Sequence, residues 1–232
     1  MPNAARVVIP DVPCHITQKG NYGQATFFDA EDRSFYLDRF TRAAREHNLD
    51  LVGWCLMTNH VHWIVIPRSP SGMARTIQRA HSEYALFVNR KHGRINGHLW
   101  QTRYYSCLLD TGHLWRALRY VELNPVRAGL VTQAEHYAYS SAAVHAGVRT
   151  VPSWLDMGLW SAAFTVEEWR NTLYVDAGDD PIKIRAAPKS GRPLGSDEFI
   201  GQTEWTVGRA LRAKKAGRRP MERAQPGFSG SE

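Results

Sequence analysis

Apolar and polar positions along the first fifty residues follow a strand and then a helix. Residues 12–18 (VPCHITQ) predict a strand, and a Gly/Asn turn over residues 20–23 follows it. Asp29 is a typical helix N-cap, and two acidic residues stand in the first turn behind it, where the helix dipole favours them. Apolar residues then recur at helical spacing as far as Asn48, which predicts an amphipathic helix.

The next segments have the periods of two strands, a helix and a strand. Residues 51–57 and 60–66 are apolar runs on either side of a short turn, which predicts a hairpin. Residues 72–91 return to helical spacing, and residues 104–109 form a fourth strand. The order β-α-β-β-α-β is that of the ferredoxin-like split βαβ fold. This is an α+β fold with two helices on one face of an antiparallel sheet.

The pattern beyond the fourth strand predicts further helices. A helix over residues 113–124 has Thr111 as its expected cap and Pro125 as its expected end. Residues 137–174 are also expected to be helical, with Trp160 and Trp169 among the aromatic residues that would pack inside.

The composition changes again after residue 175. Residues 176–196 have the Gly, Pro and charge content of a linker, and Ser196 can cap a last short helix. We therefore expect one domain over residues 1–175. Residues 176–232 would supply a linker, a short helix and a basic tail.

Composition excludes several classes of protein. Hydrophobic residues make up 43% and charged residues 22%, which excludes wholesale disorder. The longest apolar run is a few residues, far short of the ~20 that a membrane span needs. No apolar stretch follows the N-terminus, so no secretory signal is expected. The three separated cysteines are typical of reduced, buried thiols, and we expect a cytoplasmic protein.

Positive charge is concentrated near the C-terminus. Residues 183–223 hold eleven Lys/Arg and four Asp/Glu, a balance of +7 that equals the net charge of the whole chain. A neutral body with a basic tail indicates a polyanionic partner, with nucleic acid as the first candidate. A tail that only improves solubility would give the same charge pattern.

The sharpest local motif is Asn59-His60-Val61-His62-Trp63. Side chains alternate across a strand, so His60 and His62 point to the same face. Two adjacent imidazoles can form half of a divalent metal site, although structural histidines are the commoner reason for such a pair. The chain has no His-Glu-x-x-His helix and no Cys/His set, which argues against a zinc protease or a zinc finger.

A second motif covers residues 119–127 (RYVELNPVR). Tyr120 and Asn124 are four residues apart, so they share a face if the segment is helical. Because the residue before a proline is pushed away from helical angles, Asn124 would be the last helical position. A helix that ends there, with Tyr120 packed in the core, is the simpler interpretation of this segment when it is read alone.

Together, on this order of elements, the two motifs resemble the REP-associated tyrosine transposases. These are relatives of the single-tyrosine HUH transposases of insertion sequences. The resemblance covers most of residues 10–145 and has a weaker extension near residue 190. It is carried by HITQKGN (15–21), WCLMTNHVH (54–62), GHLWQTR (97–103), YVELNPVRAGLV (120–131) and GRPLGS (191–196).

This chain departs from the family pattern at three positions. The family usually has Arg where Lys19 stands, Pro where Thr58 stands and Gly where Thr102 stands. None of the three is an expected metal ligand or the nucleophile. Lys19 keeps the positive charge but loses the planar fork that makes two parallel bonds to a phosphate.

The resemblance implies a metal-dependent enzyme that cleaves and rejoins single-stranded DNA at REP-like hairpins. Tyr120 would attack a phosphodiester and leave a 5′-phosphotyrosine link and a free 3′-hydroxyl. A divalent metal, Mg²⁺ or Mn²⁺, would be held by His60, His62 and Asn124. The partner would be single-stranded DNA with hairpin structure, and the protein could be a monomer or a dimer.

Basic and aromatic residues near these motifs in the sequence are candidates for DNA contacts. The basic candidates are Lys19, Arg90, Lys91, Arg94, Arg103, Arg127 and Arg192, the last in a Gly-Arg-Pro element like those that lie in a DNA minor groove. The aromatic candidates are Tyr22, Trp100 and Tyr104, whereas His15, His81, His92 and His98 are expected not to bind metal.

Two other function classes stay open. The same fold can serve a non-catalytic nucleic-acid-binding protein, whose sheet presents aromatic rings to RNA. A metal-dependent hydrolase that uses activated water would leave Tyr120 with a structural role. A covalent protein–DNA adduct would distinguish the transposase from both.

Overall fold

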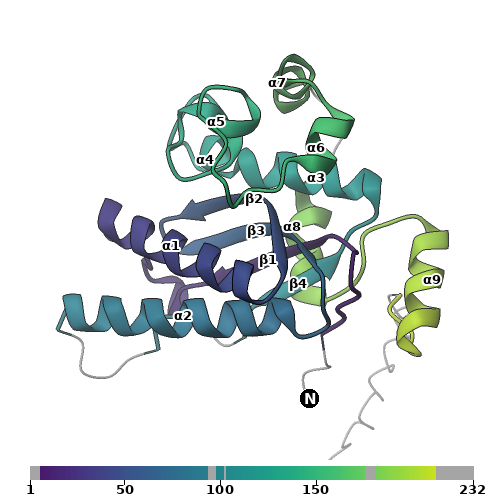
Figure 1. The fold of residues 1–232 in the computed structure, drawn as a ribbon, viewed down its shortest axis with the longest axis horizontal. Coiled ribbons are helices and arrows are strands. Elements are labelled where there is room, and N and C mark those ends of the chain that lie inside the picture. The colour runs from purple at the N-terminus through teal and green to yellow at the C-terminus, as the bar shows by residue number, and fades with distance from the viewer. Residues whose placement is uncertain (1–5, 94–97, 102, 176–180, 213–232) are drawn as a thin grey trace, which may run out of the picture.

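A four-stranded antiparallel sheet forms the centre of the molecule (Figure 1). The computed structural model describes residues 6–93, 98–101, 103–175 and 181–212. The strands are β1 (Cys14–Lys19), β2 (Leu49–Met57), β3 (His60–Pro67) and β4 (Tyr105–Leu108), in the order β2-β3-β1-β4. These strands agree with the predicted ranges to within two residues. With one helix between β1 and β2 and another between β3 and β4, this is the expected ferredoxin-like α+β fold.

Helices α1 (Ala30–Glu46) and α2 (Gly72–Lys91) cover one face of the sheet (Figure 1). Asp29 caps α1 as predicted, because its carboxylate accepts a hydrogen bond from the backbone N–H of Asp32 at 3.0 Å. Alternate residues of β3, Trp63 among them, are buried against these helices. The ring of Trp63 stacks on Phe40 of α1 with centroids 4.0 Å apart.

Helix α3 (Thr111–Glu122) covers the other face. Ile64 and Ile66 of β3 pack there in one cluster with Leu118. His60 and His62 are in the same alternation as Ile64, so they face α3, not α1 and α2. The expected cap at Thr111 is wrong by one residue, because the carboxylate of Asp110 accepts the hydrogen bond from the backbone of His113 at 2.7 Å.

Short helices follow α3, and the helical character expected over residues 137–174 takes the form of three separate helices there. The short helices after α3 are α4 (Asn124–Arg127), η2 (Ala134–His136), α5 (Ala142–His145), α6 (Gly158–Ala163) and α7 (Val166–Tyr174), and a further turn, η1 (Asn21–Gly23), follows β1. Trp160 and Trp169 are buried among them, as predicted.

The end of α3 is anchored to these short helices by Glu122, whose side chain is fully buried. Its carboxylate accepts hydrogen bonds from Ser141 Oγ at 2.6 Å and Trp169 Nε1 at 2.9 Å, and it lies 2.5 Å from His145 Nδ1. A buried carboxylate needs several partners of this kind to offset its loss of water. Glu122 therefore fixes the position of the helix end that carries Tyr120.

The linker expected over residues 176–196 is wrong for the described part of that segment. Residues Pro181–Ser190 form helix α8, which packs against β4 and α3 and buries Ile184 and Ala187. Leu194 then continues beside β4, because its N–H donates to the carbonyl of Leu108 at 2.9 Å. Strand β4 is the edge of the sheet, and covering such an edge satisfies its backbone groups and shields its apolar side chains.

The last described helix is α9 (Asp197–Val207), and Ser196 caps it as predicted. The three cysteines are buried free thiols, also as predicted. No helix in the described parts of the chain has both the length and the apolar character needed to cross a membrane.

Candidate active site

A pocket of about 280 Å³ opens on the α3 face of the sheet, between β1, β3, α3 and α8. His60, His62, Tyr120 and Asn124 all line it, so the two sequence motifs meet in one place. Four basic residues complete its charged wall: Lys19, Arg127, Arg185 and Lys189. We call this the tyrosine pocket.

The two histidines stand side by side on β3, with ring centroids 4.9 Å apart. Nδ1 of His60 lies 2.7 Å from Oδ1 of Asn59, and the amide nitrogen of Asn59 donates to the carbonyl of Gly23 at 3.1 Å. An amide oxygen only accepts, so Nδ1 of His60 must carry the proton. That leaves Nε2 of His60 with a lone pair, which is the form that binds a metal.

His62 is oriented by a third histidine, His15 of β1. Nε2 of His15 lies 2.9 Å from Nδ1 of His62, and the two rings stack with centroids 5.1 Å apart. His15 is fully buried behind His62 and also meets the edge of Tyr120, at 6.2 Å between centroids. The sequence by itself gives His15 no role. Alternation along the first strand groups it with Lys19, but only strand pairing shows that both face β3's histidines.

Burial sets the charge state of the histidine pair. It lowers the pKa of His60 to about 4, and the positive charges of Lys19 and Arg185 act in the same direction. Burial also lowers the pKa of His62 well below its ordinary value, and the neighbouring His60 and His15 add to the effect. Both imidazoles are therefore neutral at neutral pH, as metal ligands must be.

Tyr120 projects from the last turn of α3 toward the histidines, with its ring centroid 5.9 Å from that of His62. Burial raises the pKa of its phenol, whereas the charges of Arg127 and Arg185 lower it. The guanidinium of Arg127 lies 4.4 Å from the Tyr120 ring centroid and donates a hydrogen bond to the Tyr120 carbonyl. The net effect is a raised pKa, so these two cations offset part of the effect of burial on the phenol.

Asn124 begins helix α4, so the expectation that it ends α3 is wrong. Pro125 stands in the first turn of α4, where its missing N–H removes no hydrogen bond. The Asn124 amide nitrogen donates to the carbonyls of Tyr120 at 3.0 Å and Val121 at 3.3 Å. Because the nitrogen is held against α3, the amide oxygen is the atom left for a ligand in the pocket.

The donor set of the tyrosine pocket suits a divalent cation. The described residues contain no group of three His, Cys, Asp or Glu arranged to hold a metal. The available donors are therefore Nε2 of His60, the imidazole of His62 and the amide oxygen of Asn124. Two neutral imidazoles and one amide leave coordination positions for phosphate oxygens and water. The residues present fit such an ion.

Of the proposed basic residues that the structure describes, two line this pocket, Lys19 and Arg127. Arg90 and Lys91 lie at the end of α2, on the other face of the sheet. Nζ of Lys91 bonds there to the carboxylates of Asp29, Glu31 and Asp32, at 2.7, 2.8 and 2.9 Å. Arg90 and Lys91 therefore do not line the tyrosine pocket, because closeness in sequence does not decide the face of the sheet, and their contact with DNA stays a prediction.

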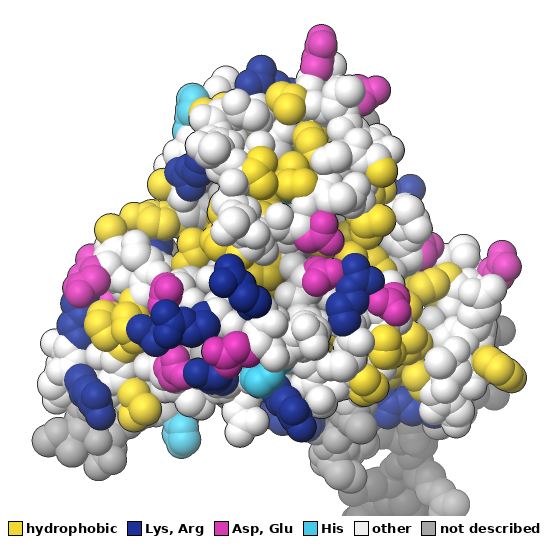
Figure 2. Space-filling view, in the orientation of Figure 1, with side chains coloured by type: hydrophobic (Ala, Val, Ile, Leu, Met, Phe, Trp, Pro, Cys, Tyr) yellow, Lys and Arg dark blue, Asp and Glu magenta, His cyan; other side chains and the backbone are white. Residues whose placement is uncertain are grey.

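The remaining proposed basic residues lie elsewhere. Arg103 lines a different cavity, on the α2 face, and Arg192 is exposed after α8 without lining the tyrosine pocket. Arg94 is outside the described residues. Figure 2 shows a face of the molecule on which Lys and Arg side chains are interspersed with Asp and Glu, so this face has no continuous basic surface.

Helix α8 supplies two basic residues of the pocket, Arg185 and Lys189, from a segment whose composition predicts a linker. With Ile182 they recur at intervals of three and four residues, which places them on one face of the helix. That spacing is the signal by which the sequence could have identified them. Pro188 inside the segment obscures it, because proline normally interrupts a helix.

Comparison with known proteins identifies a matching family and structures of related proteins. Residues 10–124 match the family described as IS200-like transposases. Among solved structures, a REP-associated tyrosine transposase bound to a REP hairpin is 15% identical, with a TM-score of 0.54, over 68% of this chain and 96% of that one. A putative transposase from Deinococcus radiodurans is 18% identical over 52% of this chain and 95% of that one, with a TM-score of 0.38. The comparison with curated proteins found no significant match.

The first of these structures shares the fold of this chain, and the family match covers the segment that carries the histidine pair, Tyr120 and Asn124. The chain belongs to the family of IS200-like transposases.

Proposed function

We propose that this protein is a metal-dependent transposase that cleaves and rejoins single-stranded DNA at REP-like hairpins through a 5′-phosphotyrosine intermediate. Transposases act on DNA by cleavage and strand transfer, and the family membership supports that general activity. The solved structure of similar fold is bound to a REP hairpin, which supports a hairpin as the partner.

One observation carries the proposal: a tyrosine, two neutral imidazoles, an amide and four cations share one small pocket. A phenol has an ordinary pKa of about 10, so attack by Tyr120 at neutral pH requires stabilisation of the phenolate. Arg127 and Arg185 provide positive charge close to that ring. A tyrosine with only a structural role would not need cations placed in this way.

In the proposed step, Tyr120 Oη attacks the phosphorus of the scissile phosphodiester and loses its proton to solvent. The bond from phosphorus to the 3′-oxygen breaks, and that oxygen takes up a proton to become a free 3′-hydroxyl. The phosphate stays joined to Tyr120 and to the 5′ end of the downstream strand. Attack of a 3′-hydroxyl on this link rejoins the strands without an external source of energy, because one phosphodiester is exchanged for another.

A divalent ion held by His60, His62 and Asn124 would polarise the non-bridging phosphate oxygens of the scissile group. The protein orients the metal-binding side chains in advance, because Asn59 fixes the ring of His60 and His15 fixes the ring of His62. Lys19 and Arg127 stand at the same pocket for the flanking phosphates.

A direct test is to incubate the protein with labelled single-stranded hairpin DNA and Mg²⁺ or Mn²⁺. A denaturing gel should then show a covalent protein–DNA adduct together with a shortened strand that ends in a 3′-hydroxyl. Binding without any adduct would favour a non-catalytic nucleic-acid-binding protein. Cleavage without an adduct would favour a hydrolase that uses activated water.

Removal of the metal ligands should abolish cleavage. His60→Ala and His62→Ala each delete one imidazole donor, and we expect both variants to lose adduct formation, as should the wild type in the presence of a chelator. Asn124→Ala should have a milder effect, because a neutral amide is a weak ligand that water can replace. The yield of adduct, measured for each of the three variants over a series of Mn²⁺ concentrations, tests these effects. Wild-type rates in both histidine variants would contradict the metal site.

The basic face of α8 should contribute to DNA affinity. We expect the double variant Arg185→Ala, Lys189→Ala to bind hairpin DNA more weakly and with less dependence on salt. The slope of log K against log salt should fall by about 0.7 for each phosphate that the variant no longer neutralises. Lys183→Ala is the matched control, since Lys183 lies on the same helix outside the tyrosine pocket. Equal slopes for the double variant and the wild type would show that α8 does not bind phosphates.

A further inference from the structure

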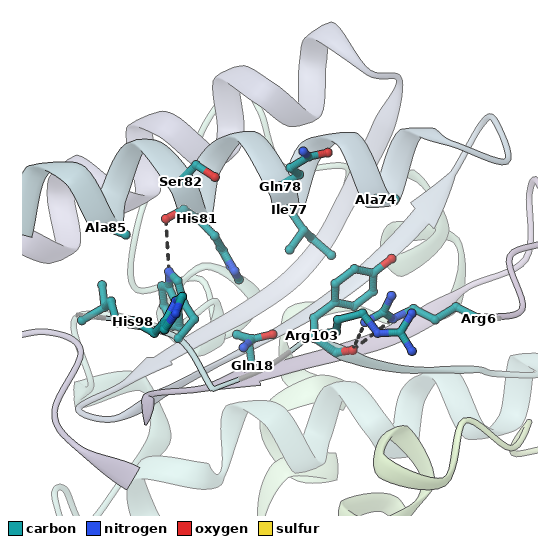
Figure 3. A pocket seen from close by; sticks show the side chains of 13 residues that line it. Arg6, Gln18, Ala74, Ile77, Gln78, His81, Ser82, Ala85, His98 and Arg103 are labelled. Atoms are coloured by element: carbon teal, nitrogen blue, oxygen red, sulfur yellow. Dashed lines mark hydrogen bonds between the residues drawn. The ribbon is translucent and has the colours of Figure 1, made fainter. Parts of the chain in front are cut away.

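A second cavity, which we call the α2 cavity, lies on the opposite face of the sheet at the C-terminal end of β1 (Figure 3). Its volume is about 520 Å³, larger than that of the tyrosine pocket. Gln18 lines the α2 cavity, and the next residue, Lys19, lines the tyrosine pocket. Since successive residues of a strand point to opposite faces, the two pockets lie back to back across the end of β1.

One end of the α2 cavity is basic. Figure 3 shows Arg6 and Arg103 at this end, away from His81 and His98. Arg6 is held in place, because Nε and Nη2 donate to the carbonyl of Tyr104 at 3.0 and 2.6 Å, and its guanidinium lies 3.6 Å from the centroid of that ring. Burial lowers the pKa of Arg6, Tyr104 partly opposes this effect, and the nearby charge of Arg103 adds to it.

No carboxylate offsets these charges within the cavity, because the described residues that line it include neither Asp nor Glu. Two guanidinium groups without an acidic partner favour binding of an anion. The planar, forked geometry of arginine matches the oxygens of a phosphate in particular.

The rest of the cavity wall combines aromatic rings with polar groups. The ring of Trp100 stacks on His81 at 4.3 Å between centroids, and its Nε1 donates to the His81 carbonyl at 3.2 Å. Gln78 and Ser82 of α2 add an amide and a hydroxyl that are exposed to solvent. Rings beside hydrogen-bonding side chains are the usual surroundings of an unpaired base.

We propose that the α2 cavity binds one unpaired nucleotide of the same DNA strand that reaches Tyr120, with the base against the aromatic wall and the phosphate at Arg6 and Arg103. This inference rests on the proposed function. The DNA strand would pass around the end of β1, from the α2 cavity at Gln18 to the tyrosine pocket at Lys19. Binding in both pockets would fix which phosphodiester lies opposite Tyr120, and so would help to select the cleavage site.

The test is an abasic scan of the single-stranded DNA that flanks the hairpin. Each flanking nucleotide is replaced in turn by an abasic residue, and affinity is measured without divalent metal, so that no strand is cut. We expect the wild type to lose affinity about tenfold at one flanking position, the effect of removing a single stacked base. Arg103→Ala and Ser82→Tyr should weaken binding of the intact flank to a similar extent and should be insensitive to that abasic position.

Arg75→Ala is the control, because Arg75 is an exposed arginine of α2 that does not line the cavity. It should keep the wild-type response at the abasic position. A scan with no sensitive position, or pocket variants that retain the sensitivity, would overturn the proposal. Tighter binding of a matching RNA flank would also overturn it, since the cavity would then prefer another nucleic acid.

The nucleotide site and the proposed function can fail separately. If the wild type forms the Tyr120 adduct but the abasic scan is flat, the α2 cavity is not a nucleotide site and the proposed function stands. If no hairpin DNA binds or becomes linked to the protein, the proposed function and the nucleotide site are both rejected.

Discussion

Tyr120→Phe should abolish the covalent protein–DNA adduct while leaving hairpin binding nearly intact. The change deletes only the hydroxyl oxygen that would form the bond to phosphorus. The ring still packs beside His62 and beneath the guanidinium of Arg127, so the pocket should keep its shape. We expect adduct and cleaved strand to fall to the background of a reaction without protein. Affinity should change less than about twofold, within the ~0.5 kcal/mol typical of mild substitutions.

Tyr137→Phe is a suitable comparison, because Tyr137 is a buried tyrosine whose hydroxyl donates to the carbonyl of Leu56 at 2.8 Å, outside the tyrosine pocket. This variant should still form the adduct. DNA-linked protein that persists in Tyr120→Phe would refute the assignment of Tyr120 as the nucleophile, and the metal site would then have to activate water instead.

Glu122→Ala should reduce the free energy of unfolding by about 3–5 kcal/mol, the range for removing one partner of a buried charged network. The substitution leaves the donors of Ser141, His145 and Trp169 without their common acceptor in a dry interior. Denaturant unfolding, followed by tryptophan fluorescence, measures the loss directly. Glu122→Gln keeps the size of the side chain and one acceptor oxygen, so it should cost less.

The control for this substitution is Glu167→Ala, at an exposed position in the first turn of α7. Its effect should stay within about 0.5 kcal/mol. An unchanged midpoint for Glu122→Ala would mean that the buried network does not hold α3 to the short helices. Because Glu122 lies two residues from both Tyr120 and Asn124, its loss should also reduce adduct formation under conditions where the variant is still folded.

Periodicity along the sequence predicts most of the fold. Apolar residues at intervals of two indicate a strand, and apolar residues at intervals of three to four indicate a helix. Each element is stabilised in the fold by the burial of these same residues. Helix α2 has the predicted bounds, and Asp29 and Ser196 cap helices as expected, since a cap is a contact between neighbours in the chain. The element order then leaves few possible topologies for the sheet.

Part of the candidate site follows from the same local rules. Alternation along one strand is enough to place His60 and His62 on a common face. The four-residue interval between Tyr120 and Asn124 places them close together even though the helix is interrupted between them, because α4 continues the turn after Glu122. Local sequence patterns therefore identify two pairs of site residues, His60 with His62 and Tyr120 with Asn124.

Local patterns do not bring the two pairs together. The family resemblance predicted that they meet, and the tertiary structure shows the pocket they share and the other residues that join them. His15, Arg185 and Lys189 come from elements that are distant in sequence, and pairing of β1 with β3 and packing of α8 on β4 bring them to the pocket. Packing of α2 beside α1 on the opposite face keeps Arg90 and Lys91 away from the pocket. Local patterns fix the period of an element but not its neighbours, since strand pairing and helix docking depend on contacts between residues far apart in the chain.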